Sequence, residues 1–531
     1  MEKIRESATN ITYLQDPEER EKAIQQLISS AKKYADSISE AGDFFEAGDL
    51  LQSTAEILEE HDFEEAVDVY IHTIKLWKSL IDNLVIQARL HEIAEIYLKI
   101  ADIYGLKLQN YKSEKEHILK SIKYLVDESD ILQQFGDYRK LAQNFENIAE
   151  LYFKIGDFGR AITFYYKVIE ISKANDFLDL LSFSYRQIAK GHEELDDYNS
   201  AKEAILEGID YFEGLFLRAE EKNDNLAVSQ LAQILKNLYK VIKDTTQFTY
   251  YTKKEAGAYI NLAEHLEKKD KNFQKIARYY RGAGLCYKEI HNNLIECASC
   301  FVLAGNYSKD PNEAAINYLS AANIFKDLKN FEMAYKNFIK AGDNFWNIGD
   351  AYQSTESFLN AYDLAIEVNL EFNRYGIFNQ IVRGLNKVAK EGLQNKEFFT
   401  AASLILESIK FYEQLDISKD FLLKEMVRNV YKYYYRAASL KKIGYSHVVQ
   451  SYIMASLSCI LIGKLDKAWE IISEVDSDAK TVNDYREIVK IIIDWVSEGK
   501  NVDINNFPYN LKHLIENSNE IKYLLNLFKR L

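Results

Sequence analysis

Proline is almost missing from this chain, since only 3 of its 531 residues are proline. Proline has no backbone N–H and breaks a helix interior, so its near absence favours helices from end to end. Glycine, the other common turn residue, occurs only 21 times. An all-β sandwich or a βαβ enzyme needs more turn-forming residues than this chain contains. We therefore expect an all-α protein.

Cysteine is scarce, and the chain has no excess of positive charge. Four cysteines in 531 residues are too few for a disulfide framework. Such a low content is typical of a protein in a reducing compartment. The first ten residues are charged and lack the apolar centre of a signal peptide. A formal net charge of −15 argues against nucleic acid as the main ligand, because phosphates are bound by clustered Lys and Arg. We expect a cytoplasmic protein with protein partners.

Long uncharged runs are absent with one exception, at residues 443–463 (IGYSHVVQSYIMASLSCILIG). A run of this length qualifies as a candidate membrane span. Four serines, His447 and Gln450 dilute its hydrophobicity, and lysines flank both of its ends without asymmetry. We favour a fully buried helix here, so that any membrane contact is at most peripheral.

The residues that are abundant can build a large core. Hydrophobic residues make up 47% of the chain, and Tyr (37) and Phe (28) are unusually common. A recurrent turn, made of an acidic or amide residue, an aromatic residue, two further residues and an alanine, is typical of helical hairpins. The copies are Asp62-Phe63 with Ala66, Asp157-Phe158 with Ala161, Asp197-Tyr198 with Ala201 and Asn330-Phe331 with Ala334, and looser copies lie at Asn272-Phe273 and at Phe398 with Ala401.

A fuller tetratricopeptide pattern surrounds three of these turns. Its apolar positions recur every three or four residues and so form one helical face. The copies are Phe145, Ile148, Ala149, Tyr152, Phe158, Ala161, Tyr165; Tyr185, Ile188, Ala189, His192, Tyr198, Ala201, Ile205; and Tyr318, Ala321, Ala322, Phe325, Phe331, Ala334, Phe338. The turns at Phe158 and Tyr198 are 40 residues apart, longer than the roughly 34 of the standard repeat. We predict a right-handed superhelical solenoid of antiparallel helical hairpins.

A larger duplication indicates two tandem arrays. The segment NFENIAELYFKIGDFGRAITFYYKVIE, which begins at Asn144, resembles NFIKAGDNFWNIGDAYQSTESFLNAYDLA, which begins at Asn337. The least repetitive stretch between them is DTTQFTYYTKK at residues 244–254. We therefore predict an N-terminal array over residues 1–245, a second array over 253–490 and a C-terminal helical cap over 491–531.

Residues 253–531 resemble the soluble NSF attachment proteins. The resemblance is carried by CASCFVLAGNYSKDPNEAAINYLSAANIFKDLKNFEMA from Cys297, by YKYYYRAASL from Tyr431, and by the final segment GKNVDINNFPYNLKHLIENSNEIKYLLNLFKRL. Residues 1–250 match more weakly. The resemblance implies an adaptor that grips a SNARE-like bundle of helices in membrane trafficking or complex disassembly and presents it to a hexameric AAA ATPase.

Two features depart from that family's pattern. In the family, the loop between the first two helices is rich in phenylalanine and contacts membranes. The corresponding link in this chain, residues 268–272, reads KKDKN and has no apolar residue. The family ends in an acidic tail with a final leucine that contacts the ATPase, whereas this chain ends Phe528-Lys529-Arg530-Leu531. The resemblance therefore implies an ATPase contact at Leu531, with a different or charge-complementary ATPase as the alternative.

Two basic stripes are the candidate partner-binding residues. Lys424, Arg428, Lys432 and Arg436 recur every four residues, which places them along one side of a helix. A second cluster contains Lys271, Lys275, Arg278 and Arg281, with Lys268 and Lys269 just before it. Such stripes would steer an acidic helical bundle toward the protein. The alternative is a solvated surface neutralised by nearby carboxylates such as Glu425.

No motif in the sequence predicts catalysis or a bound cofactor. Cys297 and Cys300 form one C-x-x-C unit where a zinc site needs four converging ligands, so packed free thiols are favoured. Glu114 and His117 form a single E-x-x-H unit, whereas di-iron bundles need two. We expect no metal and no cofactor, and a chain that is not an enzyme.

Aromatic clusters at Phe164-Tyr165-Tyr166 and Tyr431–Tyr435 fit either packing between hairpins or an exposed interface. Tyr433 and Tyr435 are candidates for lining a groove beside the first basic stripe. Our leading hypothesis is the adaptor described above. The alternative is a generic tetratricopeptide-repeat scaffold that binds peptides or protein partners without an ATPase.

Overall fold

The computed structural model describes residues 2–40, 43–269, 272–290, 293–371, 373–413, 420–440, 443–475 and 479–528. Every regular element in these ranges is helical: the chain forms 25 α-helices, a π-helical turn at Ile103–Lys107 and a 3-10 turn at Ile504–Asn506. The prediction of an all-α protein is confirmed.

The chain divides into two compact units. The first unit contains Met1–Lys222 and Gln233–Phe248, and the second contains Asn223–Ala232 and Thr249–Leu531. The first unit's helices are α1 (Glu2–Thr12), α2 (Pro17–Glu40), α3 (Phe44–Glu60), α4 (Ala66–Ile86), α5 (Leu90–Asp102), α6 (Tyr111–Phe135), α7 (Tyr138–Lys154), α8 (Phe158–Asn175), α9 (Leu178–Glu193) and α10 (Tyr198–Glu221). Helices α11 (Asn225–Val241) and α12 (Thr245–Lys269) contribute residues to both units.

The second unit continues with α13 (Phe273–Lys288), α14 (Leu294–Tyr307), α15 (Pro311–Asp327), α16 (Phe331–Asn347), α17 (Ala351–Glu367), α18 (Arg374–Gln394), α19 (Phe398–Glu413), α20 (Asp420–Leu440), α21 (Tyr445–Leu461), α22 (Leu465–Ser473), α23 (Lys480–Ser497), α24 (Tyr509–Glu516) and α25 (Asn519–Leu527). The stretch 244–254 lies almost entirely in α12 rather than in a loop. The boundaries 1–245, 253–490 and 491–531 stay predictions.

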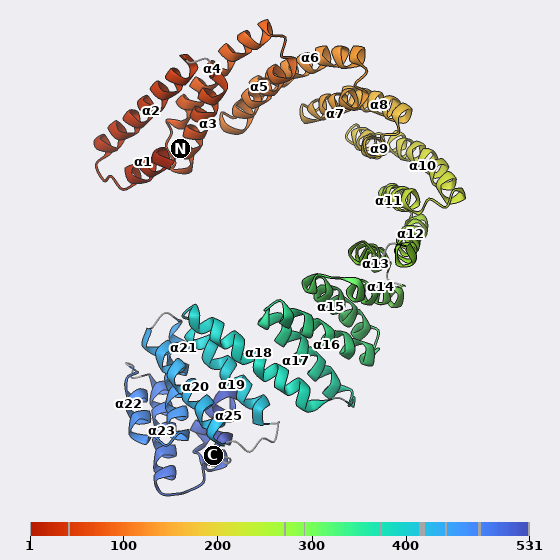
Figure 1. The fold of residues 1–531 in the computed structure, drawn as a ribbon. Coiled ribbons are helices and arrows are strands. Elements are labelled where there is room, and N and C mark those ends of the chain that lie inside the picture. Colours follow the sequence, from red (N-terminus) through yellow and green to blue (C-terminus); the bar gives the residue numbers. More distant parts are fainter. Residues whose placement is uncertain are drawn as a thin grey trace. The chain divides into compact units, whose positions relative to one another are not determined.

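Within each unit, a helix packs mainly on the helices before and after it in the sequence. The pairs α7 with α8 and α15 with α16 illustrate this arrangement (Figure 1). Short turns join such neighbours and reverse the chain, which makes each pair a hairpin. The predicted solenoid of stacked helical hairpins is therefore confirmed within the units. Some helices also pack on more distant ones: α21 on α23 and α25, α1 on α3, and α7 on α9.

At four copies of the recurrent turn, the first residue caps the next helix. Asp62 differs, because α4 begins only at Ala66 and its N-cap residue, Glu65, makes no side-chain capping hydrogen bond. The side chain of Asp157 accepts a hydrogen bond from the backbone N–H of Arg160 at 3.2 Å, and that of Asp197 accepts one from Ser200 at 3.1 Å. Asn272 and Asn330 cap α13 and α16 in the same way. The turn's alanines, such as Ala161, are buried. Each cap satisfies an N–H that the helix leaves unpaired, which contributes about 1 kcal/mol.

The aromatic residues join the helices of each unit. The fully buried tyrosines include Tyr165, Tyr185 and Tyr434. Several tyrosines also donate a hydroxyl hydrogen bond to a polar side chain on an adjacent helix: Tyr70 to Glu59 (2.8 Å), Tyr185 to Glu207 (3.0 Å), Tyr239 to Glu213 (2.6 Å), Tyr280 to Glu267 (2.8 Å) and Tyr318 to Asn306 (2.8 Å). At these positions tyrosine fills the interior with its ring and satisfies its hydroxyl at the same time.

Candidate protein-binding surfaces

The two units differ strongly in charge. The first unit contains 45 acidic and 29 basic residues, a formal net charge of −16, whereas the second contains 36 acidic and 37 basic residues, a net charge of +1. The acidity of the whole chain therefore belongs to the first unit. The two predicted basic stripes lie on a unit whose overall charge does not oppose an acidic partner.

All four residues of the α20 stripe, Lys424, Arg428, Lys432 and Arg436, are exposed. Within the described ranges, none of them has an ion pair with a carboxylate. Glu425, the carboxylate next to Lys424, is exposed and pairs with none of them. The guanidinium of Arg436 lies 4.7 Å from the centre of the Phe398 ring. The stripe is therefore a row of unneutralised cations.

The opposite side of α20 packs into the protein. Tyr434 is fully buried, and Tyr431, Tyr433 and Tyr435 are half-buried against the core of the second unit. The hydroxyl of Tyr435 donates a hydrogen bond to Glu474 at 2.9 Å. Tyr433 and Tyr435 thus have packing roles, and only their partly exposed edges face the solvent.

Two further lysines lie beside α20, but Lys467 pairs with Glu470 at 2.8 Å, so only Lys464 extends the basic surface. Lys464 lies 6.0 Å from the ring of Tyr431, and Lys467 lies 5.7 Å from the ring of Tyr435. At the start of α20, a hollow of about 620 Å³ is lined by Lys424, Lys500, Val496 and Phe528, among others. Charge and apolar surface therefore meet at that end of the stripe.

The second stripe lies on α13. Lys275, Arg278 and Arg281 are exposed, and none of them has an ion pair among the described residues. Leu285 follows on the same side of the helix and is also exposed. Lys271, predicted to belong to this stripe, lies outside the described residues, as does Leu531, the predicted ATPase contact. The role of both stripes stays a prediction.

The cysteines are packed thiols. None of the four, Cys286, Cys297, Cys300 and Cys459, forms a disulfide, and all are buried. Burial raises the pKa of Cys297 to about 11 and that of Cys300 to about 12. Thiols with such pKa values are protonated at neutral pH and react slowly. In the described part of the chain, no group of three or more His, Cys, Asp and Glu side chains is placed to hold a metal ion.

His117 of the single E-x-x-H unit is a core residue. Its ring lies among Tyr97, Tyr104 and the helix backbone, with Nδ1 2.7 Å from the carbonyl oxygen of Ser113. Burial lowers the pKa of His117, which keeps the ring neutral. The Oε1 atom of Glu114 lies 3.6 Å from Nζ of Lys154 and forms an ion pair with it. The two residues serve different contacts and make no common site.

The uncharged stretch 443–463 forms α21, which is buried along most of its length as predicted. Among the described residues, no helix has the length and apolar character that crossing a membrane requires.

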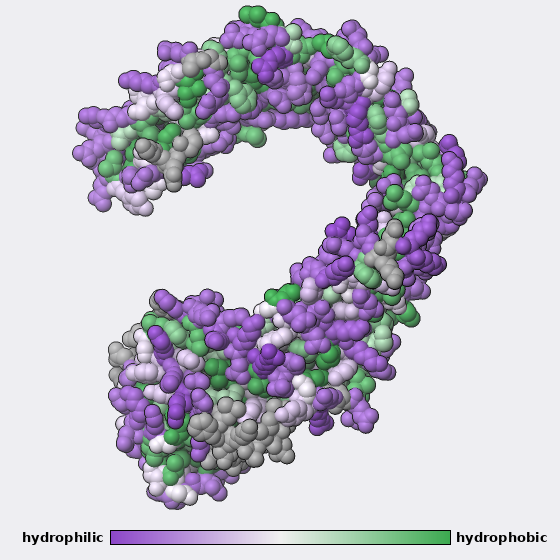
Figure 2. Space-filling model, in the orientation of Figure 1, coloured by the Kyte–Doolittle hydropathy of each residue, from purple (hydrophilic) through white to green (hydrophobic). Residues whose placement is uncertain are grey.

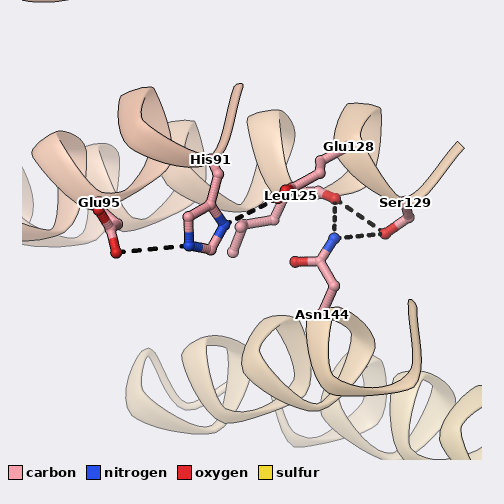
Figure 3. Close-up of polar contacts among 6 residues, drawn as sticks. All are labelled: His91, Glu95, Leu125, Glu128, Ser129 and Asn144. Atoms are coloured by element: carbon pink, nitrogen blue, oxygen red, sulfur yellow. Dashed lines mark hydrogen bonds and ion pairs between the residues drawn. The ribbon is translucent and has the colours of Figure 1, made fainter. Parts of the chain in front are cut away.

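Sequence reasoning missed a polar arrangement between α5, α6 and α7 (Figure 3). The imidazole of His91 lies between two carboxylates, with Nε2 3.5 Å from Glu95 and Nδ1 3.1 Å from Glu128. Nearby, the buried amide of Asn144 donates hydrogen bonds to the carbonyl of Leu125 (2.7 Å) and to the hydroxyl of Ser129 (3.0 Å). Counting charge separately in each half of the sequence would have directed attention to this acidic region.

Comparison with known proteins assigns no family. No protein-family model matches the chain, and no curated protein matches it. Among solved structures, it is similar to BtubC (BKLC) from P. vanneervenii, with 17% identity over 44% of this chain and 92% of that chain and a TM-score of 0.28. It is also similar to a signal transduction ATPase with numerous domains that has a tetratricopeptide repeat sensor, from Pyrococcus horikoshii, with 14% identity over 91% of this chain and 74% of that chain and a TM-score of 0.19.

Proposed function

We propose that this chain is a non-enzymatic scaffold whose second unit binds an acidic helical bundle or coiled coil through the α20 and α13 stripes. The observation that carries the proposal is the row of exposed, unpaired cations on α20. Lysine and arginine side chains on a soluble protein commonly pair with carboxylates, which are equally numerous in this unit. Cations left unpaired keep their full attraction for an acidic partner.

The shape of the partner follows from the arrangement of the stripes. Four cations along α20 extend over about 18 Å at the rise of an α-helix. A rod-shaped partner presents carboxylates over such a distance, because the surface positions of a helix repeat along its length. A globular acidic protein is large enough to cover the same length, but its surface carboxylates do not repeat at a regular spacing. An acidic coiled coil is therefore the partner that fits best.

The resemblance to soluble NSF attachment proteins extends the proposal to an adaptor role. In that version the bound bundle is SNARE-like, and Leu531 at the chain end contacts an AAA ATPase. The alternative is a tetratricopeptide-type scaffold that binds protein partners without an ATPase. Both versions share the basic stripes, so partner binding is tested first.

The test uses the full chain and a fluorescent coiled coil with glutamates at its surface positions. The variant K424E/R428E/K432E should weaken binding by at least about tenfold at low salt, and less as salt rises. The matched control is K326E/K390E/K490E, which makes the same change of net charge at exposed lysines of the same unit. Unchanged binding by the α20 variant, or equal weakening by the control, would contradict the proposal.

A second measurement separates the two versions. The ATPase activity of a purified NSF-type AAA ATPase is followed with the full chain and with a chain lacking residues 529–531. The adaptor version expects stimulation that the truncation abolishes. If the full chain binds the coiled coil but does not stimulate the ATPase, the result supports the scaffold version and contradicts the adaptor version.

A further inference from the structure

We infer that the first unit has a separate docking surface for a basic protein segment with large apolar side chains, at the meeting point of α3, α4, α5 and α6. This inference does not depend on the α20 and α13 stripes, because it concerns the other unit and a partner of opposite charge.

The surface begins in a hollow of about 700 Å³. Phe44 and Phe45 of α3 and Leu80 and Leu84 of α4 supply its apolar lining. Asp43, Arg89, Glu92 and Glu95 supply its polar lining. Asp43 caps α3 by accepting a hydrogen bond from the backbone N–H of Glu46 at 3.0 Å, which fixes that side of the hollow. A hollow with an apolar lining and a carboxylate rim suits an aliphatic or aromatic side chain that has a cation beside it.

Exposed apolar side chains continue the surface beyond the hollow. Val85 and Ile86 follow Leu84 at the end of α4, and Ile86 is 84% exposed. On α6, Glu128, Ile131 and Phe135 recur at three and four residues and share one side of the helix. Phe135 is also 84% exposed. Hydrophobic residues are visible on the molecular surface over the ends of α4 and α6 (Figure 2).

His91 links these two parts of the surface. It projects from α5, the helix that contributes Glu92 and Glu95 to the hollow, and its Nδ1 lies 3.1 Å from Glu128 on α6 (Figure 3). The end of α6 therefore lies directly beside the start of α5. The hollow, the contact of His91 with Glu128 and the apolar end of α6 form one continuous surface within the first unit.

Charge decides which partner fits. Arg89 pairs with Glu92, with Nε 2.6 Å from Oε1. A single imidazole faces the two carboxylates Glu95 and Glu128. Exposed carboxylates on the same helix ends, Asp82, Asp127 and Asp130, have no ion pair with a described residue. With a net charge of −16 on the whole unit, an apolar patch rimmed in this way favours lysine- and arginine-rich partners.

The test measures binding of the full chain to three labelled synthetic peptides by fluorescence anisotropy. One peptide is an amphipathic helix of leucine and lysine, the second replaces lysine by glutamate, and the third replaces leucine by serine. The leucine–lysine peptide should bind more tightly than either of the others by about tenfold or more, because it alone meets both the apolar and the acidic parts of the surface.

Two variants locate the binding surface. E92Q/E95Q/E128Q should weaken binding of the leucine–lysine peptide by about tenfold, and I86S/F135S by several-fold, since it removes apolar contacts. The matched control E193Q/E194Q/E203Q removes the same charge from exposed carboxylates of the same unit, at the last residue of α9, just after α9, and on α10. Its binding should stay within about twofold of the parent.

Several results would overturn the inference. One is no binding of the leucine–lysine peptide, and another is equal weakening by the control and the E92Q/E95Q/E128Q variant. A third comes from sedimentation of the parent chain. If the parent self-associates and only E92Q/E95Q/E128Q and I86S/F135S are monomeric, the surface is an interface with a second copy and not a site for a basic partner.

Discussion

Gly48 of α3 lies against the indole ring of Trp77 on α4. A Cβ atom at Gly48 would overlap atoms of that ring, and Trp77 is fully buried and unable to move aside. The absence of a side chain at position 48 is therefore what brings α3 and α4 together. A glycine inside a helix otherwise costs about 0.5–1 kcal/mol relative to alanine, so its presence here has a packing reason.

Replacing Gly48 by alanine should destabilise the first unit by about 1–3 kcal/mol, because overpacking forces a rigid ring or the helix backbone to shift. Urea unfolding followed by circular dichroism measures the change. The matched control is Gly159→Ala in α8, where a Cβ meets nothing within 4 Å. That variant should be neutral or stabilised by up to about 1 kcal/mol. Equal effects of the two substitutions would show that close packing is not the reason for Gly48.

Removing the cap at Asp157 should destabilise the α7–α8 hairpin by about 1 kcal/mol, because the N–H of Arg160 loses its acceptor. The measurement is the urea midpoint of Asp157→Ala. Asp157→Ser is the control, since a serine hydroxyl can accept the same hydrogen bond. A serine variant as unstable as the alanine variant would contradict a capping role.

Alkaline pH should unfold the protein through its buried tyrosines. Burial raises the pKa of Tyr434 to about 12, and its hydroxyl is 2.9 Å from that of Ser403. Burial also raises the pKa values of Tyr165 and Tyr185. A raised pKa in the folded state means that stability is fully present below the unfolded pKa near 10 and is lost as the pH rises toward 12.

The measurement is phenolate absorbance at 295 nm together with helical circular dichroism from pH 8 to 12.5. Phenolate formation by the buried tyrosines should coincide with loss of helix. In Tyr434→Phe the free energy of unfolding should fall less steeply with pH between about 10 and 12, because one titrating group is gone. An unchanged pH dependence of the free energy of unfolding would show that Tyr434 does not cause the loss of stability at alkaline pH.

The four cysteines should resist modification in the folded protein. Burial raises the pKa of Cys459 to about 12, as it does for Cys300, so the reactive thiolate is scarce at pH 8. Ellman's reagent should react with fewer than one thiol per chain within minutes in native buffer, and with all four in 6 M guanidinium. Rapid reaction of Cys297 or Cys300 in the native protein would contradict their assignment as packed thiols.

Local features of the fold were predictable because they depend on neighbours in the sequence. A cap such as Asp197 acts within three residues, and an alanine such as Ala201 faces the partner helix because of its position after that cap. The burial of α21 followed from its lack of charge. Each of these predictions needed only helix geometry and the identity of nearby side chains.

The candidate sites were only partly predictable. The spacing of Lys424, Arg428, Lys432 and Arg436 predicted a common side of one helix. Whether those cations were neutralised depended on carboxylates from other helices. The contact between His91 and Glu128 joins residues 37 positions apart, and no sequence spacing predicts such a pair.

By itself, the sequence determined that this chain is helical throughout, where its hairpins turn and which side of each helix is buried, because scarce proline, capping residues and apolar periodicity all act over a few residues. Only the tertiary structure decided which charges stay unpaired and which distant side chains meet, as His91 and Glu128 do. The reason is that neutralisation depends on distance in space, and stacked hairpins bring together side chains that are far apart along the chain.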